Sequence, residues 1–136
     1  MNLVDTSGWI EYFFSGRNVA YFTSPIEAID DLIVPVICLY EVFKKVNIVG
    51  NQAQALQAIA QMKQGSIIDI TEDIALSAAL TSLKYKLPMA DSLIFATAQA
   101  HGAVLWTQDD HFKSLPGVNY RDTRTKESRG RSKPRT

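Results

Sequence analysis

Short apolar runs alternate with longer segments of helical periodicity along the chain, and this alternation constrains the fold more than any other feature. Runs of strand length occupy residues 1–4, 32–34, 66–70 and 103–106, and residues 118–120 are a further candidate. Helical segments separate the first four runs from one another. Strands joined through helices pair in parallel, with helices on both faces of the sheet. We therefore expect a three-layer α/β fold around a central parallel sheet of four to five short strands.

The helical segments have recognisable boundaries. Helices are expected at residues 8–14, 19–29, 36–49, 51–64, 72–86 and 88–101. Thr6 and Ser7 offer capping hydroxyls to the first helix, and Gly50 suits the end of the third. Pro25 is expected to bend or interrupt the second helix because proline has no backbone N–H. Pro88 suits the first turn of the last one.

Composition predicts one domain with an ordinary core, because 46% of the 136 residues are apolar. The single cysteine, Cys38, has no partner within the chain, which excludes an internal disulfide and fits a reducing compartment. We expect it to be a buried packing thiol. No segment approaches the roughly 20 apolar residues that cross a bilayer, and no secretory signal is visible. A cytoplasmic protein without a membrane segment is expected.

Charge is unevenly distributed although the net charge is zero. Residues 1–120 carry 7 Lys and Arg against 12 Asp and Glu, whereas residues 121–136 carry 7 against 2. The second segment has too few apolar side chains to bury the surface that folding requires. We expect a folded domain over residues 1–120 and a basic, disordered tail over 121–136. The tail is either simply solvated or lies along a phosphate backbone.

Acidic side chains follow the first and fourth strands. Asp5 comes directly after the first apolar run, and Asp109 lies three residues after Trp106. Parallel strands open at their carboxyl ends onto one crevice, so these carboxylates are expected to lie close together. Two unit charges about 5 Å apart repel by roughly 3 kcal/mol at an effective dielectric near 20. Such a pocket either takes up protons or binds a hard cation such as Mg²⁺ or Mn²⁺.

Two further acids lie within predicted helices. Asp91 occupies the apolar side of its helix, with Ile94 at helical spacing, and a charge there fits either the helix dipole or a cation. Glu41 lies opposite the apolar stripe of its own helix. Because Lys44 and Lys45 follow three and four residues later, Glu41 taken alone suits a surface ion pair.

Several of these side chains also have ordinary explanations. Asp5 suits a helix N-cap, and Asp109 or Asp110 suits a cap or turn after the fourth strand. His111 offers an imidazole, but without a second histidine nearby a structural role is expected. His101 suits a helix C-terminus.

Four blocks of sequence together resemble the PIN-domain ribonucleases, and most closely the VapC-type toxins of bacterial and archaeal toxin–antitoxin pairs. The blocks are LVDTSGWI at residues 3–10, LYEV at 39–42, ADSLIFATA at 90–98 and LWTQDDHF at 105–112. One block alone is a weak signal, whereas four in this order and spacing are specific. The resemblance spans about residues 1–120 and implies a PIN-like fold.

The resemblance implies roles for individual residues. By this resemblance, Asp5 and Asp91 are the main metal ligands. Glu41 and Asp109 complete the set of four acids, and Thr6 and Thr107 supply the supporting hydroxyls. The cofactor would be Mg²⁺, with Mn²⁺ as a substitute. Glu41 would then face the crevice instead of solvent. Asp109 is preferred to Asp110 as the fourth acid because it lies two residues after Thr107.

The implied function is a Mg²⁺-dependent endoribonuclease toxin that hydrolyses RNA with a metal-activated water. The implied partners are an RNA substrate, a protein antitoxin and a second copy of the chain. Two aromatic helices carry more apolar side chains than one core-facing stripe requires. We expect the antitoxin to bind the exposed remainder, unless both helices are packed within the domain. These side chains are Trp9, Ile10, Tyr12, Phe13, Phe14, Tyr21 and Phe22.

Alternative functions remain at this point. One is a PIN-domain nuclease in RNA processing without an antitoxin, and another is a non-catalytic module that binds RNA or protein. A phosphatase or phosphoacceptor would need an acid two residues after Asp5, where Ser7 stands. The chain has no Gly-rich phosphate loop and no G-x-S-x-G motif.

Overall fold

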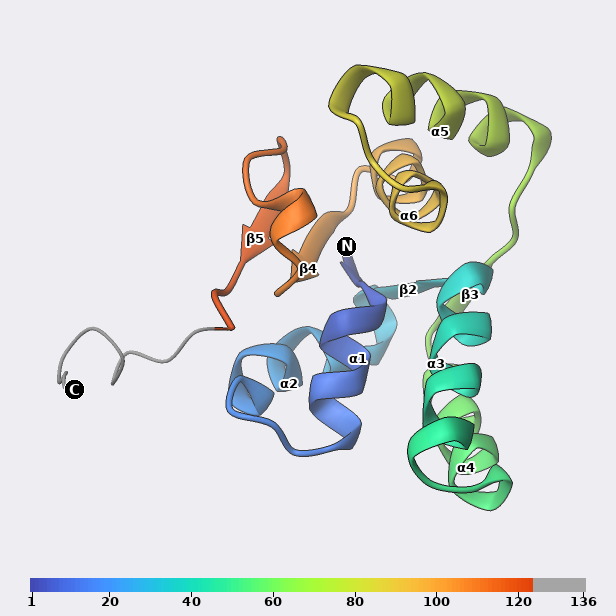
Figure 1. The fold of residues 1–136 in the computed structure, drawn as a ribbon, viewed down its shortest axis with the longest axis vertical. Coiled ribbons are helices and arrows are strands. Elements are labelled where there is room, and N and C mark those ends of the chain that lie inside the picture. The colour runs from blue at the N-terminus through green and yellow to red at the C-terminus, as the bar shows by residue number, and fades with distance from the viewer. Residues whose placement is uncertain (124–136) are drawn as a thin grey trace, which may run out of the picture.

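A single parallel sheet forms the centre of the computed structural model, which describes residues 1–123 (Figure 1). Its strands are β1 (Asn2–Val4), β2 (Leu32–Pro35), β3 (Ser66–Ile68), β4 (Val104–Thr107) and β5 (Val118–Tyr120). The strand order is β3-β2-β1-β4-β5, and every neighbouring pair is parallel. The predicted parallel α/β fold is confirmed, with all five candidate strands present.

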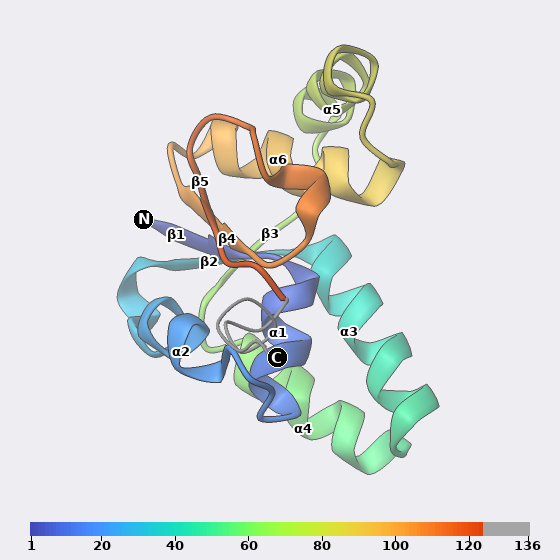
Figure 2. The same ribbon diagram turned by 60° about the vertical axis from the view of Figure 1, so that its left-hand side comes forward.

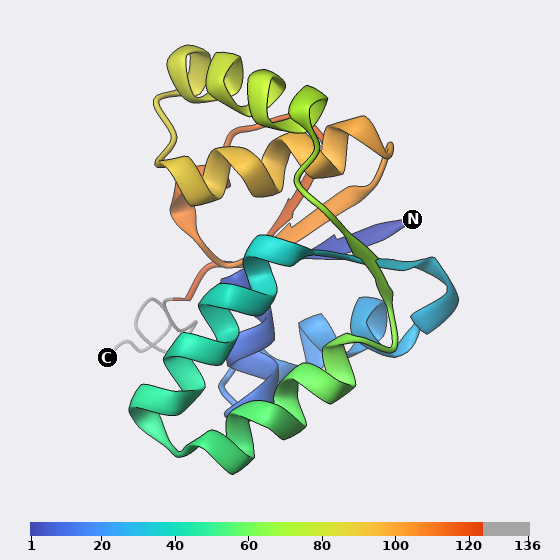
Figure 3. The ribbon, with the colours of Figure 1, turned by 90° about the vertical axis from the view of Figure 1, so that its right-hand side faces the viewer.

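Helices cover both faces of the sheet. They are α1 (Thr6–Phe13), α2 (Val19–Glu27), α3 (Val36–Val49), α4 (Gln52–Met62), α5 (Glu72–Tyr85) and α6 (Met89–Ala100), with two short 3₁₀ turns, η1 (Ile29–Asp31) and η2 (Asp110–Phe112). Figure 2 shows α5 and α6 on one side of the sheet and α1 to α4 on the other. The turned view in Figure 3 shows the same three layers.

The first helix begins earlier than the sequence predicted. The expected caps were Thr6 and Ser7, but Asp5 is the N-cap, and its carboxylate accepts a hydrogen bond of 3.0 Å from the Gly8 N–H. The helix therefore begins at Thr6, not at residue 8, because a carboxylate on the last residue before the helix satisfies a free N–H of its first turn. The second helix ends at Glu27, two residues after Pro25 and short of the predicted residue 29.

Helix α1 lies unusually close to the first strand because Gly8 has no side chain. A Cβ atom built on Gly8 would lie 2.6 Å from Val4 Cγ1 and 2.8 Å from the Phe22 ring. Real Cβ atoms do not approach other atoms so closely. Gly8 thereby allows strand β1, Asp5 and helix α1 to follow one another without an intervening loop.

The core contains aromatic side chains from both of the first two helices. The rings of Trp9 and Phe22 are fully buried, whereas Phe14 is 43% exposed, so the aromatic helices are largely packed within the domain. Trp9 stacks on Phe13 with ring centroids 5.6 Å apart. Cys38 is buried, as predicted, and burial raises the pKa of its thiol.

The chain stays in contact with the domain beyond residue 120. The Arg121 N–H donates to the Thr107 carbonyl (2.9 Å), and the Arg121 guanidinium lies 5.2 Å from the centroid of the Tyr21 ring. The Asn18 side-chain amide donates to the Asp122 carbonyl (3.2 Å). Residues 124–136 of the expected tail lie outside the described residues. Among the described helices, none has the length and apolar character needed to cross a membrane.

Candidate active site

A pocket of about 520 Å³ opens beyond the carboxyl ends of β1 and β4, and all four acids singled out in the sequence line it. Asp5 directly follows β1, and Asp109 follows β4 by two residues. Glu41 projects from α3, and Asp91 from the first turn of α6. Strand β1 lies between β2 and β4, where the direction of strand addition reverses and open α/β sheets bind ligands. The fold thus brings together carboxylates from four distant stretches of sequence.

Asp5 is the most buried of these acids, with 2% of its surface exposed. Its Oδ1 accepts hydrogen bonds from Ser7 Oγ (2.7 Å) and from the Gly8 N–H, and its Oδ2 accepts from Thr107 Oγ1 (2.6 Å). Burial nevertheless raises the pKa of Asp5 to about 7, with a small further increase from the charge of Asp109. The three donors orient the carboxylate, but they do not compensate for its removal from water.

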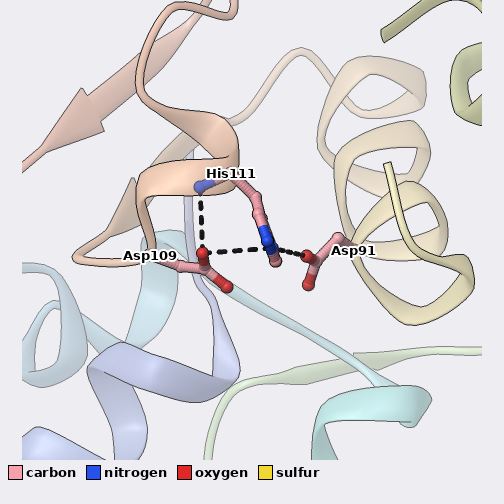
Figure 4. A group of neighbouring side chains, drawn as sticks. All are labelled: Asp91, Asp109 and His111. Carbon is pink, nitrogen blue, oxygen red and sulfur yellow. Dashed lines mark hydrogen bonds and ion pairs between the residues drawn. The ribbon is translucent and has the colours of Figure 1, made fainter. Parts of the chain in front are cut away.

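Asp91, Asp109 and His111 form a second group at the mouth of the pocket (Figure 4). His111 Nδ1 lies 2.8 Å from Asp91 Oδ2 and 3.3 Å from Asp109 Oδ1. The His111 backbone N–H also donates to Asp109 Oδ1 (2.9 Å). One donor atom from each of the three residues lies within 4.8 Å of the other two, so the group has the dimensions of a metal site.

The charges of this second group influence one another. Burial raises the pKa of Asp91, and the hydrogen bond from His111 partly opposes that change. The pKa of His111 is raised, first by its hydrogen bond to Asp91 and then by the nearby charge of Asp109. The imidazole is half exposed to the surrounding water.

Glu41 faces the pocket. Its Oε1 accepts a hydrogen bond of 2.5 Å from Thr6 Oγ1, at the start of α1. The ammonium group of Lys44 lies over the ring of Tyr40, 5.8 Å from its centroid. The helical wheel placed Glu41 on the polar side of α3 correctly, but that side lines the pocket.

Thr107 connects the two acidic groups. Its Oγ1 donates to Asp5 and accepts a hydrogen bond of 2.9 Å from the Asp109 N–H. Of the two hydroxyl positions singled out in the sequence, Thr6 thus contacts Glu41, and Thr107 contacts both Asp5 and Asp109. Asp110, the alternative fourth acid, is exposed and does not line this pocket.

The sequence interpretation gave no site role to Ser7 or His111. Ser7 donates to Asp5, and its position two residues after that acid, in the first helical turn, was the available signal. The position of His111 two residues after Asp109 was a weaker signal, because its contact with Asp91 depends on how α6 and η2 meet in space.

Basic and apolar side chains form another part of the pocket wall. Lys44 and Lys45 on α3 are exposed and line the pocket together with Tyr40, and Ile10 and Ile48 supply apolar surface. An anionic chain lying in this pocket would therefore meet two ammonium groups beside the acidic centre.

In a comparison with protein families, residues 3–118 match the family described as the PIN domain. No curated protein matches the chain.

Several solved structures share the fold. A toxin–antitoxin complex from Klebsiella pneumoniae is 30% identical, with a TM-score of 0.72, and the match covers 88% of this chain and 96% of the other. VapC20 from Mycobacterium tuberculosis, described as a sarcin-ricin loop cleaving toxin, is 16% identical with a TM-score of 0.73 over 85% and 95% of the two chains. VapBC2 from Rickettsia felis, bound to a DNA fragment from its promoter, is 18% identical with a TM-score of 0.68 over 89% and 97%.

Proposed function

The chain belongs to the PIN domain family, and from this premise we propose that it is a divalent-metal-dependent endoribonuclease that acts as the toxin of a toxin–antitoxin pair. The observation that carries the proposal is the convergence of Asp5, Glu41, Asp91 and Asp109 on one pocket. Carboxylates held this close in a partly buried site are stabilised by a cation that neutralises their mutual repulsion.

The donor set fits a hard divalent cation. Carboxylate oxygens are the ligands that Mg²⁺ prefers, and the buried Asp5, with its pKa raised to about 7, would gain stability from a neighbouring positive charge. In this proposal Asp5 and Asp91 hold Mg²⁺, and Mn²⁺ can replace it. The bound ion would lower the pKa of a coordinated water and neutralise charge on a phosphodiester.

The remaining residues have distinct tasks in this proposal. Ser7 and Thr107 hold the Asp5 carboxylate in place through their hydroxyls. Glu41 would accept a hydrogen bond from the attacking water and take up its one proton, and Asp109 completes the acidic quartet around the cation. Thr6 orients Glu41. No histidine or cysteine nucleophile is needed for hydrolysis by this arrangement.

The exposed lysines support a nucleic-acid substrate. Lys44 and Lys45 place positive charge beside the acidic centre, where a phosphate chain would pass. The choice of RNA rests on the resemblance to VapC-type toxins and on the similar fold of a toxin described as cleaving the sarcin-ricin loop.

The proposed partners are a protein antitoxin and a second copy of the chain. The antitoxin is supported by the 30% identical protein, which was solved in a toxin–antitoxin complex. The homodimer is supported by an apolar row on α5, where Leu76, Leu80 and Leu83 are 60%, 70% and 77% exposed. Cytoplasmic localisation and the boundary between domain and tail near residue 120 stay predictions.

Cleavage of RNA by the purified chain tests the proposed chemistry. Wild type, Asp5→Asn and Asp91→Asn should be compared with Mg²⁺, with Mn²⁺ and with a chelator. Asp110→Asn is a matched control, because it removes an exposed acid next to the pocket without touching its lining. We expect cleavage by wild type and the control only, and only with metal. Equal cleavage by all four proteins would contradict the proposal.

A further inference from the structure

We propose that His111 is itself a ligand of the divalent cation and binds it through Nδ1 together with the carboxylates of Asp91 and Asp109. This inference rests on the proposed function, which places a cation in the same pocket. The ion would then have one nitrogen ligand in addition to the carboxylate oxygens.

The distances within the group match those between neighbouring ligands of one ion. In an octahedral site with metal–ligand bonds of about 2.1 Å, adjacent donor atoms lie about 3.0 Å apart. His111 Nδ1 lies 2.8 Å from one carboxylate oxygen and 3.3 Å from another. An ion placed among the three donors would need only small side-chain adjustments, because all three atoms already lie within 4.8 Å of one another.

The local structure holds the imidazole against Asp91, which lines the pocket. Asp109 caps η2 by accepting the His111 backbone N–H, which fixes the start of the turn from which the ring projects. Figure 4 shows the ring directed toward Asp91 on α6, with Nδ1 as the atom in contact. His111 Nδ1 is thus positioned by η2, and the carboxylates beside it are positioned by α6 and by the cap of η2.

A cation satisfies this arrangement better than a hydrogen bond does. A ring N–H donates along one direction, yet Nδ1 lies near oxygens of two different carboxylates. One ion can accept an electron pair from all three atoms at once. The imidazole is 53% exposed, so an ion can enter from the solvent side.

A nitrogen ligand changes which metals the site favours. Imidazole suits transition metals such as Ni²⁺ and Zn²⁺ better than it suits Mg²⁺, which prefers oxygen. We therefore expect His111→Ala to weaken Zn²⁺ binding by about tenfold or more and Mg²⁺ binding by no more than about threefold. His111→Asp restores an oxygen donor and should recover Mg²⁺ binding more fully than Zn²⁺ binding.

Pulsed electron paramagnetic resonance of bound Mn²⁺ tests the proposal directly, because it detects nitrogen coordinated to the metal. The full-length chain, labelled with ¹⁵N-histidine, should show coupling from one histidine nitrogen. His101→Ala is the matched control, since His101 is the only other histidine and its ring lies beside the Thr97 carbonyl at the end of α6. We expect the coupling in wild type and His101→Ala and its loss in His111→Ala and His111→Asp.

The outcomes separate this inference from the proposed function. Bound Mn²⁺ that depends on Asp91 but shows no histidine coupling would overturn the ligand role of His111 and leave the metal site standing. Coupling that persists in His111→Ala would overturn it as well. Failure of wild type to bind Mn²⁺ in calorimetry would overturn both. Circular dichroism of each variant shows whether it is folded.

Discussion

Thr107 Oγ1 lies 2.6 Å from Asp5 Oδ2 and joins two residues that are 102 positions apart in the sequence. The same oxygen accepts the Asp109 N–H, so one hydroxyl contacts the buried carboxylate that follows β1 and the backbone after β4. This side chain at the end of the fourth strand therefore helps to set the relative position of the two acids.

Replacing Thr107 by Val should destabilise the domain by about 1 to 3 kcal/mol, because the buried Asp5 loses a donor and the Asp109 N–H loses its acceptor. Urea unfolding followed by circular dichroism measures this loss. Thr107→Ser keeps the hydroxyl and should retain most of the stability. A valine variant as stable as wild type would show that this hydroxyl does not hold the two acids.

When divalent metal is removed, the raised pKa of Asp5 should make the free energy of unfolding decrease as pH rises from about 4 to about 7. Its pKa is raised from 3.8 to about 7, so in this range the folded chain retains a proton that the unfolded chain has released. The folded state then binds more protons, and stability decreases with pH until Asp5 is ionised in both states. Asp5→Asn lacks this contribution, and its stability relative to wild type should increase over the same range.

Denaturant unfolding of both proteins in chelator at several pH values measures that difference and cancels the contribution of the other carboxylates. Parallel stability curves would mean that the pKa of Asp5 is not raised. Added Mn²⁺ should reduce the difference at pH 7, because the ion favours the ionised carboxylate of wild type.

Replacing Lys44 and Lys45 by Ala should weaken RNA binding and reduce the slope of log K against log salt by about one to two, since each contacted phosphate releases about one counterion. Binding is measured in the Asp5→Asn background to prevent cleavage. Lys63→Ala, an exposed lysine at the end of α4, is the control and should change neither quantity. An unchanged slope in the double variant would exclude this path for the substrate.

The apolar row on α5 should carry the proposed dimer. Leu80→Glu and Leu83→Glu place charges on this row and are expected to convert the dimer into a monomer. Light scattering after size-exclusion chromatography measures the mass. Leu56→Glu introduces the same charge at a leucine of α4 that is 54% exposed, and it should leave the mass unchanged. A monomeric wild type, or a dimer in every variant, would contradict the prediction.

Much of the fold could be predicted from the sequence because strand and helix periodicities are local properties. The runs at 32–34 and 66–70 became β2 and β3 with ends moved by one or two residues. For Asp5 the sequence suggested two roles, a helix N-cap and a carboxylate of the pocket, and the two are compatible. It caps α1 and also lines the pocket, because the cap position and the carboxyl end of β1 coincide.

The site was harder to predict where side chains meet only through tertiary packing. A helical wheel separates polar from apolar sides, but it does not distinguish a polar pocket from open solvent, so it assigned Glu41 to the surface. His111 was expected to have a structural role because no second histidine lies nearby in the sequence. Its partner is Asp91, which is brought close by the packing of α6 beside η2.

The backbone at Asp5 is held more firmly than the outer turn at Asp109 and His111, because Gly8 lets α1 pack directly against β1. Asp5 directly follows the central strand, and its own N–H donates to the Trp106 carbonyl, so its amide should exchange with solvent hydrogen slowly. Asp109 caps the short 3₁₀ turn η2, and His111 lies within it, so exchange of their amides should be faster. The preorganised carboxylate would thus set the depth at which an ion rests, and the outer turn would adapt to its radius.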